Sequence, residues 1–78
     1  MERETVSSQI DLAEVAWPFC LLQLKNALLG LKPGDLLETR VSDSMIFTTI
    51  QRILLHSQDR VIKAEGSGPF YQLTILKG

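Results

Sequence analysis

The chain has 78 residues, of which 45% are hydrophobic and 22% charged, and its formal net charge is −1. This length makes one small domain with a limited core, and the interspersed charges argue against a nucleic-acid binder, which would need a basic face. The apolar runs are too short to cross a membrane. The charged residues 1–4 lack the apolar stretch of a signal peptide, so we expect none.

The use of cysteine and histidine narrows the function further. The single cysteine, Cys20, cannot form an internal disulfide, which fits a reducing cytoplasm. One cysteine also excludes a cysteine-based metal cluster, and the single His56 leaves almost nothing to bind a transition metal. We therefore expect a cytoplasmic monomer, and the residues imply no metal, nucleotide or flavin cofactor.

Hydrophobic patterning predicts six segments after a polar, flexible N-terminus at residues 1–8. Alternation with a period of two marks the strands, and a period of 3.6 marks the helices. Pro18 suits the first position of a helix, Gly30 ends that helix, and Asp43 offers an N-cap for the next one. In the order strand, helix, strand, helix, strand, strand, the predicted segments are residues 9–12, 18–29, 35–41, 45–56, 60–65 and 70–76.

The order βαβαββ predicts a fold of the α/β class in its α+β form. We expect a two-layer sandwich in which a four-stranded mixed sheet carries both helices on one face. Two helices cannot cover both faces of such a sheet. The other face should therefore be partly exposed, which explains the charged residues that alternate along the strands, among them Glu38, Arg40, Lys63 and Glu65.

The helical wheel separates a core face from an outer face on each predicted helix. On the first helix, three apolar residues fall toward the edge or the solvent side: Phe19, Leu22 and Leu29. The core face of that helix comprises Cys20, Leu21, Leu24, Ala27 and Leu28. On the second helix the core face comprises Ile46, Ile50, Ile53, Leu54 and Ser57. In the third strand, alternation places Ile62 and Ala64 on one side.

Several features along the chain match the pattern of one family of small proteins. Asp11 lies six residues before Trp17, Pro18 opens the first helix, residues 31–35 form an apolar-x-Pro-Gly-acidic turn, and Asp43 opens the second helix. With this element order, nearly the whole chain resembles the TusA (SirA-like) family of small sulfur-carrier proteins. The family signature is Cys-Pro-x-Pro at the start of the first helix. The resemblance implies a cysteine there that carries a persulfide sulfur and hands it to partner proteins.

The differences from the family pattern fall on the chemistry. Trp17 stands at the family's cysteine position and Cys20 at its second proline, so Cys-Pro-x-Pro has become Trp-Pro-Phe-Cys. Other positions that differ are Glu14, Ser44, Gln51 and Leu76. The resemblance therefore implies a single TusA-like domain over residues 9–78, but the persulfide chemistry does not transfer automatically.

Cys20 and Trp17 each allow two interpretations. The N-terminus of a helix stabilises a thiolate, so Cys20 could serve as a relocated persulfide carrier. Alternatively, Cys20 is a small buried hydrophobe that shares its face with Leu24 and Leu28. Trp17 cannot be a nucleophile; it is either a hydrophobic plug that covers the former active position or an exposed anchor for a partner protein.

Two functions remain open. The chain could be a sulfurtransferase-like carrier in an intracellular sulfur relay, with sulfur arriving on Cys20 as a persulfide and leaving by attack of a partner thiol. It could instead be a non-catalytic binding or regulatory module that has lost sulfur transfer. In both cases the partner is another protein, of the relay or of a regulatory system. The residues expected to contact that partner are Trp17, Pro18, Phe19, Leu22, Lys25 and Asp43, although capping of the second helix would suffice to explain Asp43.

Overall fold

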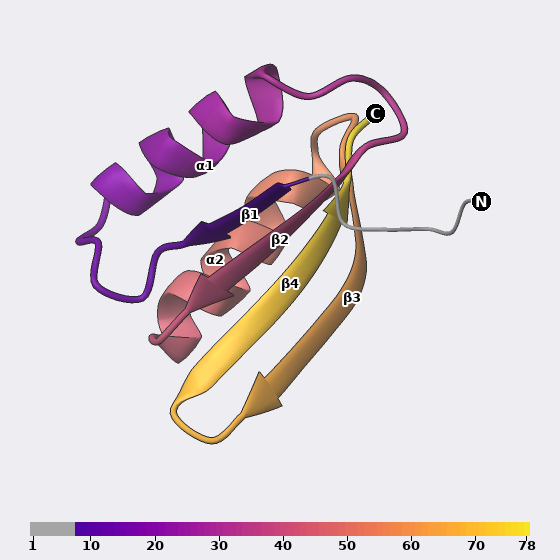
Figure 1. The fold of residues 1–78 in the computed structure, drawn as a ribbon. Coiled ribbons are helices and arrows are strands. Elements are labelled where there is room, and N and C mark those ends of the chain that lie inside the picture. Colours follow the sequence, from indigo (N-terminus) through magenta and orange to yellow (C-terminus); the bar gives the residue numbers. More distant parts are fainter. Residues whose placement is uncertain (1–7) are drawn as a thin grey trace.

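The computed structural model of the protein describes residues 8–78, apart from the side chain of Ser67. It contains the predicted elements in the predicted order (Figure 1). Residues 1–7 of the expected flexible segment lie outside the described residues, whereas Ser8 already belongs to the first strand. The elements are β1 (Ser8–Asp11), α1 (Phe19–Leu29), β2 (Leu36–Val41), α2 (Ser44–Leu55), β3 (Arg60–Ser67) and β4 (Phe70–Leu76).

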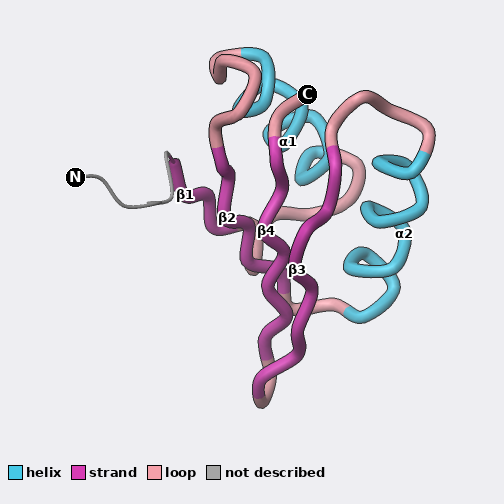
Figure 2. Tube along the Cα trace, turned by 90° about the vertical axis from the view of Figure 1, so that its right-hand side faces the viewer, coloured by secondary structure: helices cyan, strands magenta, loops and turns pink. Residues whose placement is uncertain are grey.

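The four strands form one mixed sheet in the spatial order β1-β2-β4-β3. β1 pairs with β2 in parallel, and β4 pairs antiparallel with β2 on one side and with β3 on the other. Both helices lie on the same side of this sheet (Figure 2). The predicted two-layer α+β sandwich is therefore confirmed.

One hydrophobic core joins the helix layer to the inner face of the sheet. The predicted core face of α1 is correct, because Cys20, Leu24 and Leu28 are all buried. From α2, Ile50 and Leu54 are buried, as their positions on the wheel predict. The placement of Ser57 on that core face is wrong, because α2 ends at Leu55 and Ser57 is exposed in the following turn. The core is completed by buried residues of the sheet and of the loop after β1: Leu12, Leu37, Thr39, Val41, Leu73 and Ile75.

The predicted alternation in β3 is wrong. The register between β3 and β4 shifts just after Val61, so that Val61 lies opposite Ile75 while Ala64 lies opposite Leu73. Directly opposed residues point to the same side of a sheet, so Val61 and Ala64 both face the helix side, where Val61 packs against the core and Ala64 is exposed. Ile62 is the extra residue of a bulge and is 54% exposed. One inserted residue reverses the side on which each later side chain emerges, and a period-two pattern cannot reveal it.

A tight turn returns the chain from α1 to the sheet. The N–H of Asp35 donates to the carbonyl of Lys32 at 2.9 Å, and Gly34 adopts a φ of +96°, which favours glycine. Lys77, just after β4, donates its N–H to the carbonyl of Asp35 and accepts from the N–H of Gly34, both at 2.9 Å. The residue that follows the last strand therefore anchors the turn between α1 and β2.

Candidate functional site

The start of α1 lies one residue later than predicted. The helix begins at Phe19, and Pro18 is the residue before it instead of the first helical residue. The carbonyl of Pro18 accepts from the N–H groups of Leu21 and Leu22 at 3.1 and 3.2 Å, and the Trp17–Pro18 peptide bond is cis. Cys20 is therefore the second residue of the helix and lies within its first turn.

Cys20 is fully buried, with 0% of its surface exposed. It lies in the core cluster with Leu24 and Leu28, so its side chain behaves as a small hydrophobe. Its N–H already donates to the carbonyl of Ala16 at 3.0 Å and is not free to stabilise a charge at the helix start. Another protein could reach the sulfur only after this end of the helix had opened.

The neighbours of Cys20 in the motif are exposed. Trp17 is 44%, Phe19 59% and Leu22 54% exposed. The wheel thus placed Phe19 and Leu22 correctly on the outer side of α1. We call these three residues the aromatic patch. Large apolar side chains gathered at one exposed end of a helix are typical of a protein-protein contact.

The two polar residues predicted for the site lie differently. Lys25 is an exposed residue of α1, three residues after Leu22, which is the last residue of the aromatic patch. Asp43 caps α2, since its Oδ1 accepts from the N–H groups of Met45 and Ile46 at 2.7 and 3.2 Å. The predicted cap is confirmed, and the Asp43 carboxylate is engaged with its own helix.

An ion pair on the open face of the sheet holds the loop that leads to the aromatic patch. Arg40 of β2 donates to Asp11 at the end of β1 at 2.6 Å, and the N–H of Ala13 donates to the same carboxyl group at 3.0 Å. The hydrogen bond from Arg40, followed by that from Ala13, lowers the pKa of Asp11 below its ordinary value. Ser42 adds a hydrogen bond to the carbonyl of Ala13 at 2.6 Å.

The sequence pattern indicates Asp11 but not its ion pair with Arg40. Arg40 also lies over the ring of Phe70, with 4.2 Å between the guanidinium carbon and the ring centroid. The two charged residues are 29 positions apart and meet only because β1 and β2 pair in the register that places Asp11 beside Arg40. No local pattern carries that register.

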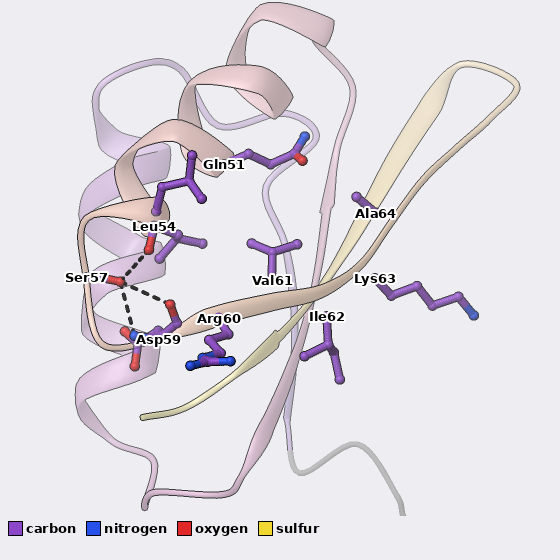
Figure 3. A pocket seen from close by; sticks show the side chains of 10 residues that line it. Gln51, Leu54, Ser57, Asp59, Arg60, Val61, Ile62, Lys63 and Ala64 are labelled. Atoms are coloured by element: carbon purple, nitrogen blue, oxygen red, sulfur yellow. Dashed lines mark hydrogen bonds between the residues drawn. The ribbon is translucent and has the colours of Figure 1, made fainter.

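One concavity lies away from the motif, between α2 and β3. It has a volume of about 650 Å³ and is lined by residues of α2, of the following turn and of β3. Figure 3 shows Val61 directed toward α2, whereas Ile62 emerges on the opposite side of the strand. Within it, Ser57 donates to the carbonyl of Leu54 at 2.9 Å and accepts from the N–H of Asp59 at 3.1 Å. None of the predicted site residues lines this concavity.

Two further properties concern the described part of the chain, residues 8–78. Within it, no three residues of the types His, Cys, Asp and Glu are grouped so that they could hold a metal ion. No helix in this part of the chain combines the length and the apolar character that crossing a membrane requires.

Comparison with known proteins adds one result. No protein-family model matches the chain, and no curated protein matches it. Among solved structures, the chain resembles the crystal structure of a SirA-like protein from Desulfitobacterium hafniense, with a TM-score of 0.70 and 20% sequence identity. The two proteins share one fold. The match covers 91% of this chain and 97% of the other, so the SirA-like fold accounts for almost the whole domain.

Proposed function

We propose that this SirA-like domain is a non-catalytic binding module that docks a partner protein at the start of α1, in the cytoplasm. The observation that carries the proposal is the contrast within one motif, in which Cys20 is 0% exposed while Phe19 beside it is 59% exposed. A sulfur carrier needs an accessible thiolate. A docking module needs an accessible apolar surface. The motif offers such a surface but no accessible thiol.

The composition of the aromatic patch suits a docking role. Tryptophan is among the residues most often found to dominate binding energy, with truncation costing about 2 kcal/mol or more at such positions. Trp17 and Phe19 supply the large apolar area, and Leu22 extends it along the helix. The sequence resemblance points to the same surface, because the family docks its partners around the motif at the start of the first helix.

The remaining predicted residues act around this patch. Pro18 fixes the chain between Trp17 and the first turn of α1, and Lys25 supplies a cation at the polar rim of the contact. Asp43 acts through the cap of α2. The partner would be a protein of a sulfur relay or of a regulatory system that reads the SirA-like surface without exchanging sulfur.

The alternative, a relocated carrier, requires Cys20 to leave the core. Its thiolate would attack the terminal sulfur of a donor persulfide and release the donor thiolate, and an acceptor thiolate would later remove that sulfur in the same way. The position of Cys20 in the first turn of α1 favours this chemistry. Its burial opposes it.

The rate of alkylation of Cys20 separates the two functions. A buried thiol reacts only from opened states, and a domain of 78 residues is stable by roughly 4 to 12 kcal/mol, so alkylation should be slowed by about 10³-fold or more relative to the unfolded chain. The native protein would be alkylated over a range of pH and followed by intact mass, with the same sample in denaturant as reference. A parallel sample would be incubated with a persulfide donor.

Protection of the native thiol and no gain of mass would support the binding module. Alkylation within about tenfold of the unfolded rate, together with a stable gain of one sulfur atom, would show that Cys20 is the carrier.

Site-specific photocrosslinking tests the docking surface directly. A photoreactive phenylalanine analogue at position 19 should capture a defined partner, and Trp17→Ala should abolish the capture. The matched control carries the same analogue at position 63. Lys63 is exposed on β3, which is the edge strand of the sheet opposite β1. Equal capture from positions 19 and 63 would refute the proposed surface.

A further inference from the structure

A second apolar surface lies between the two helices and does not include the aromatic patch. It is a groove of about 270 Å³, and its walls come from one side of α1 and from the second half of α2. Among the residues that line it are Leu21, Leu28 and Leu29 of α1 and Ile50 and Ile53 of α2. Leu29 is 77% exposed, so one wall presents apolar surface directly to water.

The charges around the groove have one dominant sign. Neither α1 nor α2 contains an aspartate or a glutamate. Lys25 and Lys77 line the groove, and Asp59 is the one carboxylate among the described lining residues. Asp59 already accepts from the N–H of Gly78 at 2.9 Å and lies 3.8 Å from the Lys77 ammonium. Asp59 and Lys77 therefore offset each other, and the positive charge that the rim presents to a partner comes from Lys25.

The size and shape of the groove restrict what can occupy it. Small-molecule pockets usually measure about 300 to 1,000 Å³ and enclose most of the ligand. At about 270 Å³, this groove lies just below that range. It can receive a few apolar side chains projecting from a partner. A row of such side chains beside two helices is what an amphipathic helix supplies.

We propose that this groove receives an amphipathic helix of a partner protein whose apolar stripe is flanked by aspartate or glutamate. The apolar residues, spaced i, i+3 or i+4, and i+7, would pack between α1 and α2. The acidic flank would face Lys25, the lining lysine that is not paired with Asp59. Charged groups at such a rim set the orientation and the choice of partner more than the total affinity.

This inference deepens the proposed function as a protein-binding module by naming the chemistry of a partner segment. It uses a different surface, since Trp17 and Phe19 do not line the groove. A variant such as Trp17→Ala should therefore abolish docking at the aromatic patch and leave binding in the groove unchanged. The two proposals can fail independently.

The test uses two synthetic helical peptides with the same leucine stripe, one flanked by glutamates and the other by lysines. Binding would be measured by fluorescence anisotropy at about 50 mM and about 500 mM salt, and mapped by backbone amide chemical shifts. The acidic peptide should bind about tenfold more tightly than the basic one at low salt, and the difference should shrink at high salt. The shifts should fall on α1 from Leu21 onward and on the second half of α2.

A matched pair of charge reversals tests the role of the rim. Lys25 lines the groove, whereas Arg52, the other cation of the helices, does not. Lys25→Glu should weaken binding of the acidic peptide by about tenfold and strengthen binding of the basic one, while Arg52→Glu should change neither appreciably. Both residues are exposed, so both variants should fold.

Three results would overturn the proposal. The first is equal binding, or no binding, of the two peptides. The second is an equal loss in Lys25→Glu and Arg52→Glu. The third is failure of both peptides together with sedimentation of the protein on vesicles that contain phosphatidylglycerol, which would assign the groove to a membrane surface.

Discussion

Substitution of Cys20 provides a sharp test of its place in the core. Cys20→Ala removes one buried sulfur atom, comparable in size to a methylene group, so the lost burial and the small cavity should cost about 1 kcal/mol of unfolding free energy. Cys20→Ser keeps the volume but places a hydroxyl group where the cysteine is 0% exposed, among Leu24 and Leu28. A buried hydroxyl without a good partner costs about 1 to 3 kcal/mol, so serine should be the more damaging change.

Urea unfolding, followed by circular dichroism and by Trp17 fluorescence, measures both changes at constant slope. In thermal unfolding, each kcal/mol should appear as a fall of about 4 to 8 °C in the melting temperature of a domain this small. Trp17→Phe, at a partly exposed position, is the control and should change stability by less than about 0.5 kcal/mol. Because this variant lacks the chain's single tryptophan, its unfolding is followed by circular dichroism alone. If Cys20→Ala and Cys20→Ser both stay within that margin, or if serine is the milder change, Cys20 is not a core residue and the argument for a binding module fails.

Three further predictions concern stability. Asp43→Ala should cost about 1 kcal/mol in urea unfolding, because two N–H groups of α2 lose their acceptor, whereas Asp43→Asn should retain most of the cap; equal losses would contradict this. The Thr39 hydroxyl is buried with no hydrogen-bond partner among the described residues, so Thr39→Val should raise stability by about 1 kcal/mol, and a loss would show that the hydroxyl is satisfied. Because the pKa of Asp11 is lowered in the folded state, its contribution is present above the unfolded pKa of about 3.9 and disappears as pH falls through the folded pKa. Asp11→Asn should therefore destabilise the protein at pH 7 and cease to do so in strong acid; a constant difference would exclude the linkage.

Local patterns in the sequence were sufficient for the elements and for most of the core. On α1, burial repeats with the helical period, so Cys20, Leu24 and Leu28 could be assigned to one face and Phe19 and Leu22 to the other. The ends of both helices carry their own chemical marks, a proline and a glycine around α1 and an aspartate before α2. Each of these signals acts within a few residues.

What could not be predicted depends on pairing between distant segments. The bulge at Ile62 and the meeting of Asp11 with Arg40 follow from the register of the sheet, which no single segment encodes. The burial of Cys20 is of a different kind. The wheel gave the correct face, but only the packing of α1 against the sheet decides whether the first turn of that face is covered.

The spatial order of the strands also constrains how the chain reaches this structure during synthesis. β4 is last in the chain yet lies between β2 and β3, with an antiparallel partner on each side. Among the strands of residues 8–78, the only pairing that does not involve β4 is the four-residue parallel contact of β1 with β2, so it is the one that can form before β4 has left the ribosome. The sheet, and with it the helix layer, should therefore assemble in one late step after translation of the domain, driven by contacts between distant residues.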